Sequence, residues 1–118
     1  MSTATADPVA PATAAPEALR AQAEAACRLM KVLSHPDRLL LLCQLAQGEQ
    51  RVGELESRLG ITQPTLSQQL AVLRDEALVR TRREGKHIHY AVASAPALAV
   101  INVLYQQFCG PLKENAPC

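Results

Sequence analysis

The spacing of apolar residues changes along the chain, and each spacing predicts a type of secondary structure. From residue 17 to residue 33, apolar side chains recur every three or four positions, as in an amphipathic helix. A second helix is expected from Ser34, a good N-cap, to Gln47, with Gly48 after its end. Its four consecutive leucines exceed one stripe, so we expect burial on most of its sides. The stripe of the first helix consists of Leu19, Ala23, Cys27, Met30 and Leu33.

Two short helical segments separated by a glycine follow. The first, residues 52–59, stops at Gly60, and the second is expected to begin at an N-cap, Thr62. Leucines at 66, 70 and 73 then face inward, which leaves a face of amides and hydroxyls rather than of Lys and Glu. Such groups suit the base edges of a DNA major groove. The residues concerned are Gln63, Thr65, Ser67, Gln68 and Gln69.

After Leu78 the apolar spacing becomes two, which predicts a β-hairpin with a tight turn at Glu84 and Gly85. A last helix is expected from an N-cap at Ser94 until Gly110. The hairpin is basic because the only acid between positions 78 and 90 is Glu84. Its candidate DNA contacts are Arg82, Arg83, Lys86 and His87.

Length and composition limit the architecture. A chain of 118 residues fits one domain, and 48% hydrophobic residues with 3% aromatic and no Trp favour helices. We expect a disordered N-terminal tail over residues 1–16, a winged helix-turn-helix domain over 17–111 and a C-terminal tail over 112–118. No segment is typical of a signal peptide or a membrane span, which predicts a cytoplasmic protein without a membrane partner. The net charge of +1 means that any DNA footprint depends on local charge distribution.

The order of four helices, a hairpin and a fifth helix predicts a mainly α fold with a small β-hairpin, the winged helix-turn-helix. One helix would enter the major groove while the hairpin lies beside the phosphates. Each part also has a plainer interpretation. The Gln-rich face could be a solvated surface, and the Arg-rich hairpin could be an edge strand protected by charge. The succession of the parts favours DNA binding.

Three segments resemble the ArsR (SmtB/ArsR) family of dimeric winged-helix repressors: "LSHPDRLLLLCQL", "VGELESRLGITQPTLSQQLAVLRDEALVRTRREGKHIHY" and "VINVLYQQFC". The resemblance implies a homodimer built largely from the first and last helices. It also implies binding to double-stranded operator DNA with an inverted repeat. The recognition helix would run from Gln63 to about Leu73, and the wing from Arg82 to His87.

The four cysteines decide what such a regulator senses. The Cys-Val-Cys motif of arsenic sensors is absent, and the last helix lacks the Asp and His ligands of zinc sensors. Cys43 in the second helix and Cys109 in the last resemble the dithiol sub-branch of BigR, SqrR and HlyU. That resemblance implies a redox switch in which a persulfide, a polysulfide or an oxidant bridges the two thiols and releases the operator.

Other interpretations of the thiols stay open at this point. Cys43 could be a small buried hydrophobe, which is a common fate of a cysteine. A thiophilic metal or metalloid such as cadmium, arsenite or zinc could bind Cys43 and Cys109, with Cys27 or Cys118 as a third ligand. Otherwise we interpret Cys27 as packing and Cys118 as an auxiliary thiol. We predict no enzyme, no catalytic residue and no cofactor, because the chain has no C-x-x-C, His–Cys or cofactor-loop motif.

Overall fold

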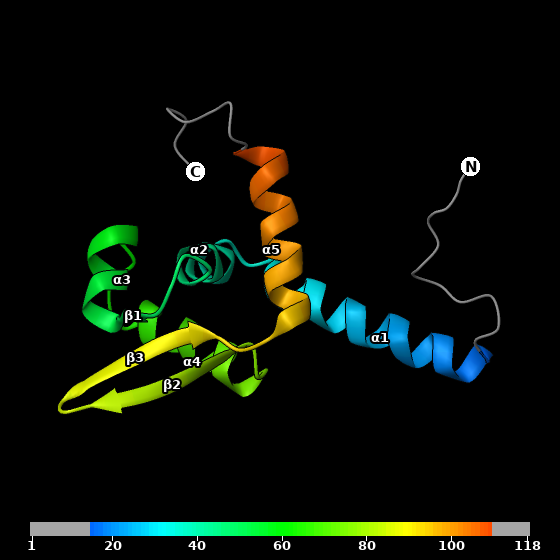
Figure 1. Cartoon of the computed structure of the whole chain (residues 1–118), viewed down its shortest axis with the longest axis horizontal. Coiled ribbons are helices and arrows are strands. Elements are labelled where there is room, and N and C mark those ends of the chain that lie inside the picture. Colours follow the sequence, from blue (N-terminus) through cyan, green and yellow to red (C-terminus); the bar gives the residue numbers. More distant parts are fainter. Residues whose placement is uncertain (1–14, 110–118) are drawn as a thin grey trace. The chain divides into compact units, whose positions relative to one another are not determined.

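A computed structural model describes residues 15–109 of the chain. These residues belong to two compact units, one ending at Lys31 and the other starting at Val32. The first unit holds most of helix α1 (Pro16–Leu33), and the second holds the end of α1 and every other described element (Figure 1). Residues 1–14 and 110–118, with Gly110 and Cys118, lie outside the described part, so the domain limits inferred from the sequence stay predictions.

Together with α1, the elements of the second unit give the predicted order of four helices, a hairpin and a last helix, which confirms the winged helix-turn-helix fold. The second unit also contains a strand that was not predicted, β1, which pairs with β3 to give an antiparallel sheet of order β1-β3-β2. The elements are α2 (Pro36–Leu45), β1 (Gln50–Arg51), α3 (Val52–Leu59), α4 (Thr65–Asp75), β2 (Val79–Glu84), β3 (His87–Val92) and α5 (Ala95–Phe108).

Two of the predicted helix starts are wrong. The N-cap of α2 is His35 rather than Ser34: its ring nitrogen Nδ1 accepts a hydrogen bond from the amide of Asp37 at 3.1 Å. Helix α4 begins at Thr65 with Pro64 as its N-cap, and Thr62 accepts a hydrogen bond from Leu66 N through its carbonyl at 3.0 Å. Imidazole and backbone acceptors satisfy the same first-turn amides that a hydroxyl would.

The other helix boundaries are closer to the sequence prediction. Ser94 is the N-cap of α5, and its Oγ accepts from the amide of Ala97 at 3.1 Å. Gly60 ends α3 in the left-handed region with φ of 70°, a conformation that glycine adopts without steric cost. Helix α2 ends at Leu45, two residues before the predicted Gln47.

Helix α2 forms the centre of the second unit. Leu41 and Leu42 are fully buried and Leu45 is 2% exposed, whereas Leu39 is half-buried and Leu40 is 40% exposed. The helix packs against α3, α4, α5 and β3, and the inward leucines of α4 (Leu66, Leu70 and Leu73) are buried as predicted. The leucine run therefore supplies core contacts to four elements at once.

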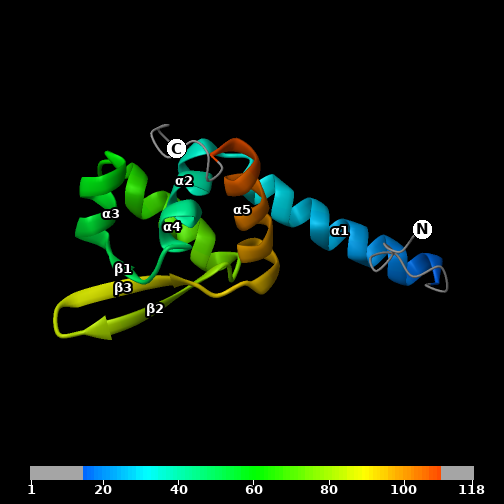
Figure 2. The same cartoon turned by 45° about the horizontal axis from the view of Figure 1, so that its top comes forward.

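The β2–β3 hairpin projects away from the helices of its unit (Figures 1 and 2). Glu84 pairs with His87, so the tight turn consists of Gly85 and Lys86 rather than of Glu84 and Gly85. At the other end of the sheet, Gln50 of β1 is only 5% exposed. Its side chain accepts from Gln44 Nε2 and Arg58 Nη1, each at 3.1 Å, and donates to Gln44 O at 2.8 Å. This amide network fixes the short strand against the end of α2.

Several large apolar side chains stay exposed within this single chain. On α5 these are Val103, Tyr105 and Phe108, of which Phe108 is 72% exposed. On α1, Leu19 and Met30 of the predicted stripe are exposed as well. No helix among residues 15–109 combines the length and the apolar character required to cross a membrane.

The adjacent leucines of α2 allow a matched test of its central position. We expect Leu42→Ala to lower the free energy of unfolding by about 2–5 kcal/mol, because it leaves a cavity in a closed core. Leu40→Ala, at a 40% exposed site in the same helix, should cost less than about 1 kcal/mol. Urea unfolding followed by circular dichroism measures both, and equal losses would contradict this account of the core.

Candidate nucleic-acid interface and thiol pocket

The polar face of the helix-turn-helix lies on α4 and on the turn before it. Gln68 and Ser67 are exposed, whereas Thr65 and Gln69 are half-buried. Gln63 precedes the helix instead of starting it, and its Oε1 accepts from Ser67 N at 3.2 Å and Ser67 Oγ at 2.6 Å. Within the described residues the Gln68 side chain makes no hydrogen bond. Both its donor and its acceptor therefore face solvent, as reading a base edge requires.

Arg82 of the hairpin is held by an acid that the sequence analysis did not identify. Glu49, in the turn between α2 and β1, accepts from Arg82 Nη2 at 2.7 Å and from Nε at 3.1 Å. This fork-shaped pair, formed across 33 positions of sequence, lowers the pKa of the Glu49 carboxyl through the Arg82 hydrogen bond. The same bond raises the pKa of Arg82. The positive charge at Arg82 is therefore already largely compensated.

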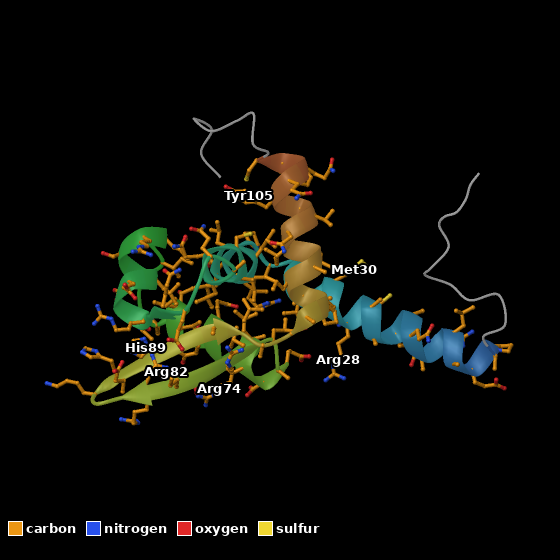
Figure 3. The ribbon with its side chains drawn as sticks, viewed as in Figure 1. Arg28, Met30, Arg74, Arg82, His89 and Tyr105 are labelled. Carbon is orange, nitrogen blue, oxygen red and sulfur yellow. The ribbon has the colours of Figure 1, made fainter. Side chains whose placement is uncertain are left out.

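The remaining basic residues of the hairpin differ from Arg82. Arg83 and Lys86 make no ion pair with any described residue, and both are exposed, as is His87. His89 lies beside Arg82 (Figure 3) and places Nε2 3.3 Å from Glu84 Oε1. The hairpin thus offers uncompensated cations near its turn and a charge-balanced cluster near its middle.

Cys43 and Cys109 border one cavity between α2 and α5, with a volume of about 430 Å³. Cys43 is half-buried on α2, and Cys109 is 4% exposed at the C-cap of α5. Tyr105, which is labelled on α5 in Figure 3, also belongs to the lining of this cavity. Among residues 15–109 no charged side chain lines it, and the described lining consists of Pro36, Leu39, Leu40, Cys43, Gln44, Gln47, Leu59, Leu104, Tyr105, Phe108 and Cys109.

The thiols themselves are in different states. Cys27 and Cys43 are free, whereas Cys109 is disulfide-bonded, so a Cys43–Cys109 bridge is not formed in this structure. Burial raises the pKa of the Cys43 thiol, which keeps it protonated at neutral pH. Cys27 is exposed on α1 in the single chain, so its packing role stays a prediction. No cluster of three potential metal ligands occurs among residues 15–109, so the metal alternative finds no third ligand there.

The sequence of this chain matches those of known regulators. Residues 35–81 match the family described as "Bacterial regulatory protein, arsR family". A biofilm growth-associated repressor of Agrobacterium fabrum is 58% identical over 87 residues, which are 74% of each chain. The chain belongs to the arsR family.

Other relatives extend this match to structure and to other regulators. The crystal structure of the transcriptional repressor BigR from Xylella fastidiosa is 49% identical, with a TM-score of 0.74 over 81% of this chain and 98% of that one. The transcriptional activator HlyU of Vibrio cholerae is 42% identical over 69% of this chain and 75% of its own length. These arsR-family relatives confirm the resemblance stated on the sequence motifs and the winged-helix fold.

Arg82 and Arg83 are neighbours with different surroundings, which gives a matched pair of variants. We expect Arg83→Ala to reduce the salt dependence of binding to random DNA by about 0.9 in the log–log slope, the value for one phosphate contact. Arg82→Ala should change it by less than half as much, because Glu49 already compensates this charge. Glu49→Gln should tighten binding to every sequence by roughly 2- to 5-fold. Anisotropy titrations at several salt concentrations measure these effects, and equal slope changes for the two arginines would contradict the proposed difference.

The raised pKa of Cys43 predicts a pH dependence of its reactivity. In a variant whose other three cysteines are serine, alkylation of Cys43 by iodoacetamide should accelerate by about tenfold per pH unit near neutrality, because the thiolate fraction grows tenfold per unit below the pKa. The corresponding variant that retains only the exposed Cys27 should react faster at pH 7, since the reagent reaches that thiol freely. A Cys43 rate that stops rising below about pH 8 would show that the thiol is not desolvated.

Proposed function

We propose that this arsR-family chain is a homodimeric transcriptional repressor that binds an inverted-repeat operator when Cys43 and Cys109 are reduced. A persulfide or polysulfide bridges these two thiols and releases the DNA. The observation that carries the proposal is that both sulfur-bearing residues border one cavity between α2 and α5. No enzymatic activity and no cofactor form part of it.

DNA reading is assigned to α4 and the hairpin. Gln68 carries sequence discrimination, with Gln63, Thr65 and Ser67 beside it, whereas Gln69 is half-buried and bonded to Arg38. Arg83, Lys86 and His87 bind phosphates near the turn of the hairpin, and Arg82 contributes less because of its pair with Glu49. The exposure of Gln68 and the absence of an ion pair at Arg83 and Lys86 within the described residues support these roles.

Dimerisation is assigned to the exposed apolar faces of α1 and α5. Phe108, Val103 and Tyr105 lie on α5, and Leu19 and Met30 on α1, all more than 40% exposed in the single chain. Large apolar side chains grouped on two helices are typical of a surface that is covered by another protein chain. A second copy of this chain gives the two-fold symmetry that an inverted-repeat operator requires.

The sulfur chemistry proceeds in two steps whose atoms and electrons balance. The Cys43 thiolate attacks the outer sulfur of R–S–SH, forming Cys43–S–SH and releasing the thiolate R–S⁻. The Cys109 thiolate then attacks the Cys43 sulfur and releases HS⁻, leaving a disulfide. The sulfane sulfur takes up the two electrons that the two thiols lose. When both cysteines become persulfides, their reaction instead leaves a trisulfide and releases H₂S.

The lining of the cavity favours uncharged sulfur species. The described residues that border it carry no charge, so an anionic or zwitterionic reagent loses hydration there without gaining a partner among them. The raised pKa of Cys43 lowers its thiolate fraction at neutral pH, which slows its attack on persulfides and peroxides alike. The favoured inducer is therefore a neutral persulfide or polysulfide with an apolar substituent.

The energetic requirement of the switch is modest. Only the difference in bridge stability between the DNA-binding and DNA-free conformations changes affinity. A difference of roughly 2–3 kcal/mol lowers operator affinity about 30- to 150-fold. A bridge from residue 43 to residue 109 lowers the conformational entropy of the unfolded chain, which adds about 4 kcal/mol to the free energy of unfolding. The difference of about 2–3 kcal/mol that the switch requires is smaller than this total.

The direct test is operator affinity before and after a persulfide donor, measured on reduced wild type, Cys43→Ser and Cys109→Ser. We expect the donor to weaken binding about 30- to 150-fold in wild type only. Intact mass should show the loss of two hydrogens or the gain of bridging sulfur. Cys27→Ser, which removes the exposed thiol of α1, is the matched control and should respond like wild type. An equal response of all variants, or no response of wild type, would refute the switch.

A further inference from the structure

One arginine connects three helices at the start of α2. The Nε of Arg38 donates to the carbonyl of Val32 near the end of α1 at 2.8 Å. Its Nη1 donates to Gln69 Oε1 of α4 at 3.1 Å, across 31 positions of sequence. The Val32 carbonyl belongs to the last turn of a helix, where backbone acceptors have no partner within the helix. Both bonds are partly buried, so a rigid guanidinium joins these helix segments at one point.

This contact separates the role of Gln69 from that of Gln68. Consecutive residues of a helix point about 100° apart, so the two amides cannot face the same direction. Gln68 is exposed, whereas Gln69 is half-buried and turns its oxygen to Arg38. Fixing Gln69 against α2 therefore also fixes the rotation of α4 about its axis, and with it the direction of Gln68.

We propose that Arg38 is a positioning residue for DNA recognition. It holds α4, through Gln69, at the rotation that presents Gln68 to the base edges, and it does not touch DNA itself. Gln69 in turn serves as the attachment point of α4 and not as a reader of bases. This inference rests on the proposed function of α4 as the DNA-reading helix, but not on the dithiol switch.

The test compares operator binding with random-DNA binding for Arg38→Met, which keeps the aliphatic stem and removes the guanidinium. We expect operator affinity to fall about tenfold, which corresponds to the loss of one oriented base contact, while affinity for random DNA stays unchanged. Arg58→Met is the matched control, since Arg58 also donates to a glutamine, Gln50, but makes no hydrogen bond or ion pair with α4 or the hairpin among residues 15–109. It should leave the ratio of operator to random affinity at the wild-type value.

A second variant guards against a loss of folding in Arg38→Met. Gln69→Met removes the acceptor on α4 and keeps the side-chain length, while Arg38 keeps its bond to Val32. We expect the same tenfold loss of discrimination, and no further loss in the double variant, because both changes break the Arg38–Gln69 bond. An unchanged ratio in Gln69→Met, or a further tenfold loss in the double variant, would overturn the positioning role.

Gln68→Ala, measured in parallel, distinguishes a failure of the positioning role of Arg38 from a failure of the reading role of α4. If Gln68→Ala abolishes discrimination while Gln69→Met and Arg38→Met retain it, the positioning role fails and the reading role of α4 stands. If Gln68→Ala also retains discrimination, the proposed reading role of α4 fails, and the inference about Arg38 fails with it. An equal loss on random DNA for Arg38→Met would mean that Arg38 contacts phosphate, which also overturns the inference.

Discussion

Burial of the α2 leucines is the constraint on which the rest of the second unit depends. Leu41, Leu42 and Leu45 are closed off from solvent because α3, α4, α5 and β3 all pack on this one short helix. A helix with four packed neighbours cannot shift without changing its contacts with several of them. The candidate thiol, the arginine that reaches α4 and the amide network that anchors β1 all start from this helix or its end.

Local sequence patterns predicted the elements well because their causes are local. The spacing of Leu66, Leu70 and Leu73 determines which side of α4 is buried, and all three are. Gly60 and Ser94 act through conformational freedom and one short hydrogen bond, which depend only on their immediate neighbours. From the same patterns, the sequence predicts that the candidate Gln-rich face and the basic hairpin belong to one winged helix-turn-helix.

The features that the sequence did not reveal are formed by contacts between distant residues. The Glu49–Arg82 pair spans 33 positions and the Arg38–Gln69 bond spans 31, and neither has a periodicity that could indicate it. Strand β1 is only two residues long and exists through its pairing with β3. Ser34 and His35 both carry a side-chain acceptor, so the local sequence does not show which of them caps α2. In the structure His35 has an extended backbone, and its imidazole accepts the hydrogen bond from the Asp37 amide.

Cys43 and Gln44 are adjacent on α2, and their side chains link this helix to different elements of the unit. The two side chains point about 100° apart around the helix, so Cys43 borders the cavity with α5 while Gln44 also bonds Gln50 of β1. Arg38, on the first turn, reaches towards α4. A few degrees of rotation of α2 about its own axis would therefore change the direction of the sulfur, the seating of the sheet and the contact with α4 together. The sulfur of Cys43, the Gln44–Gln50 bond and the Arg38–Gln69 bond therefore all depend on the orientation of one ten-residue helix.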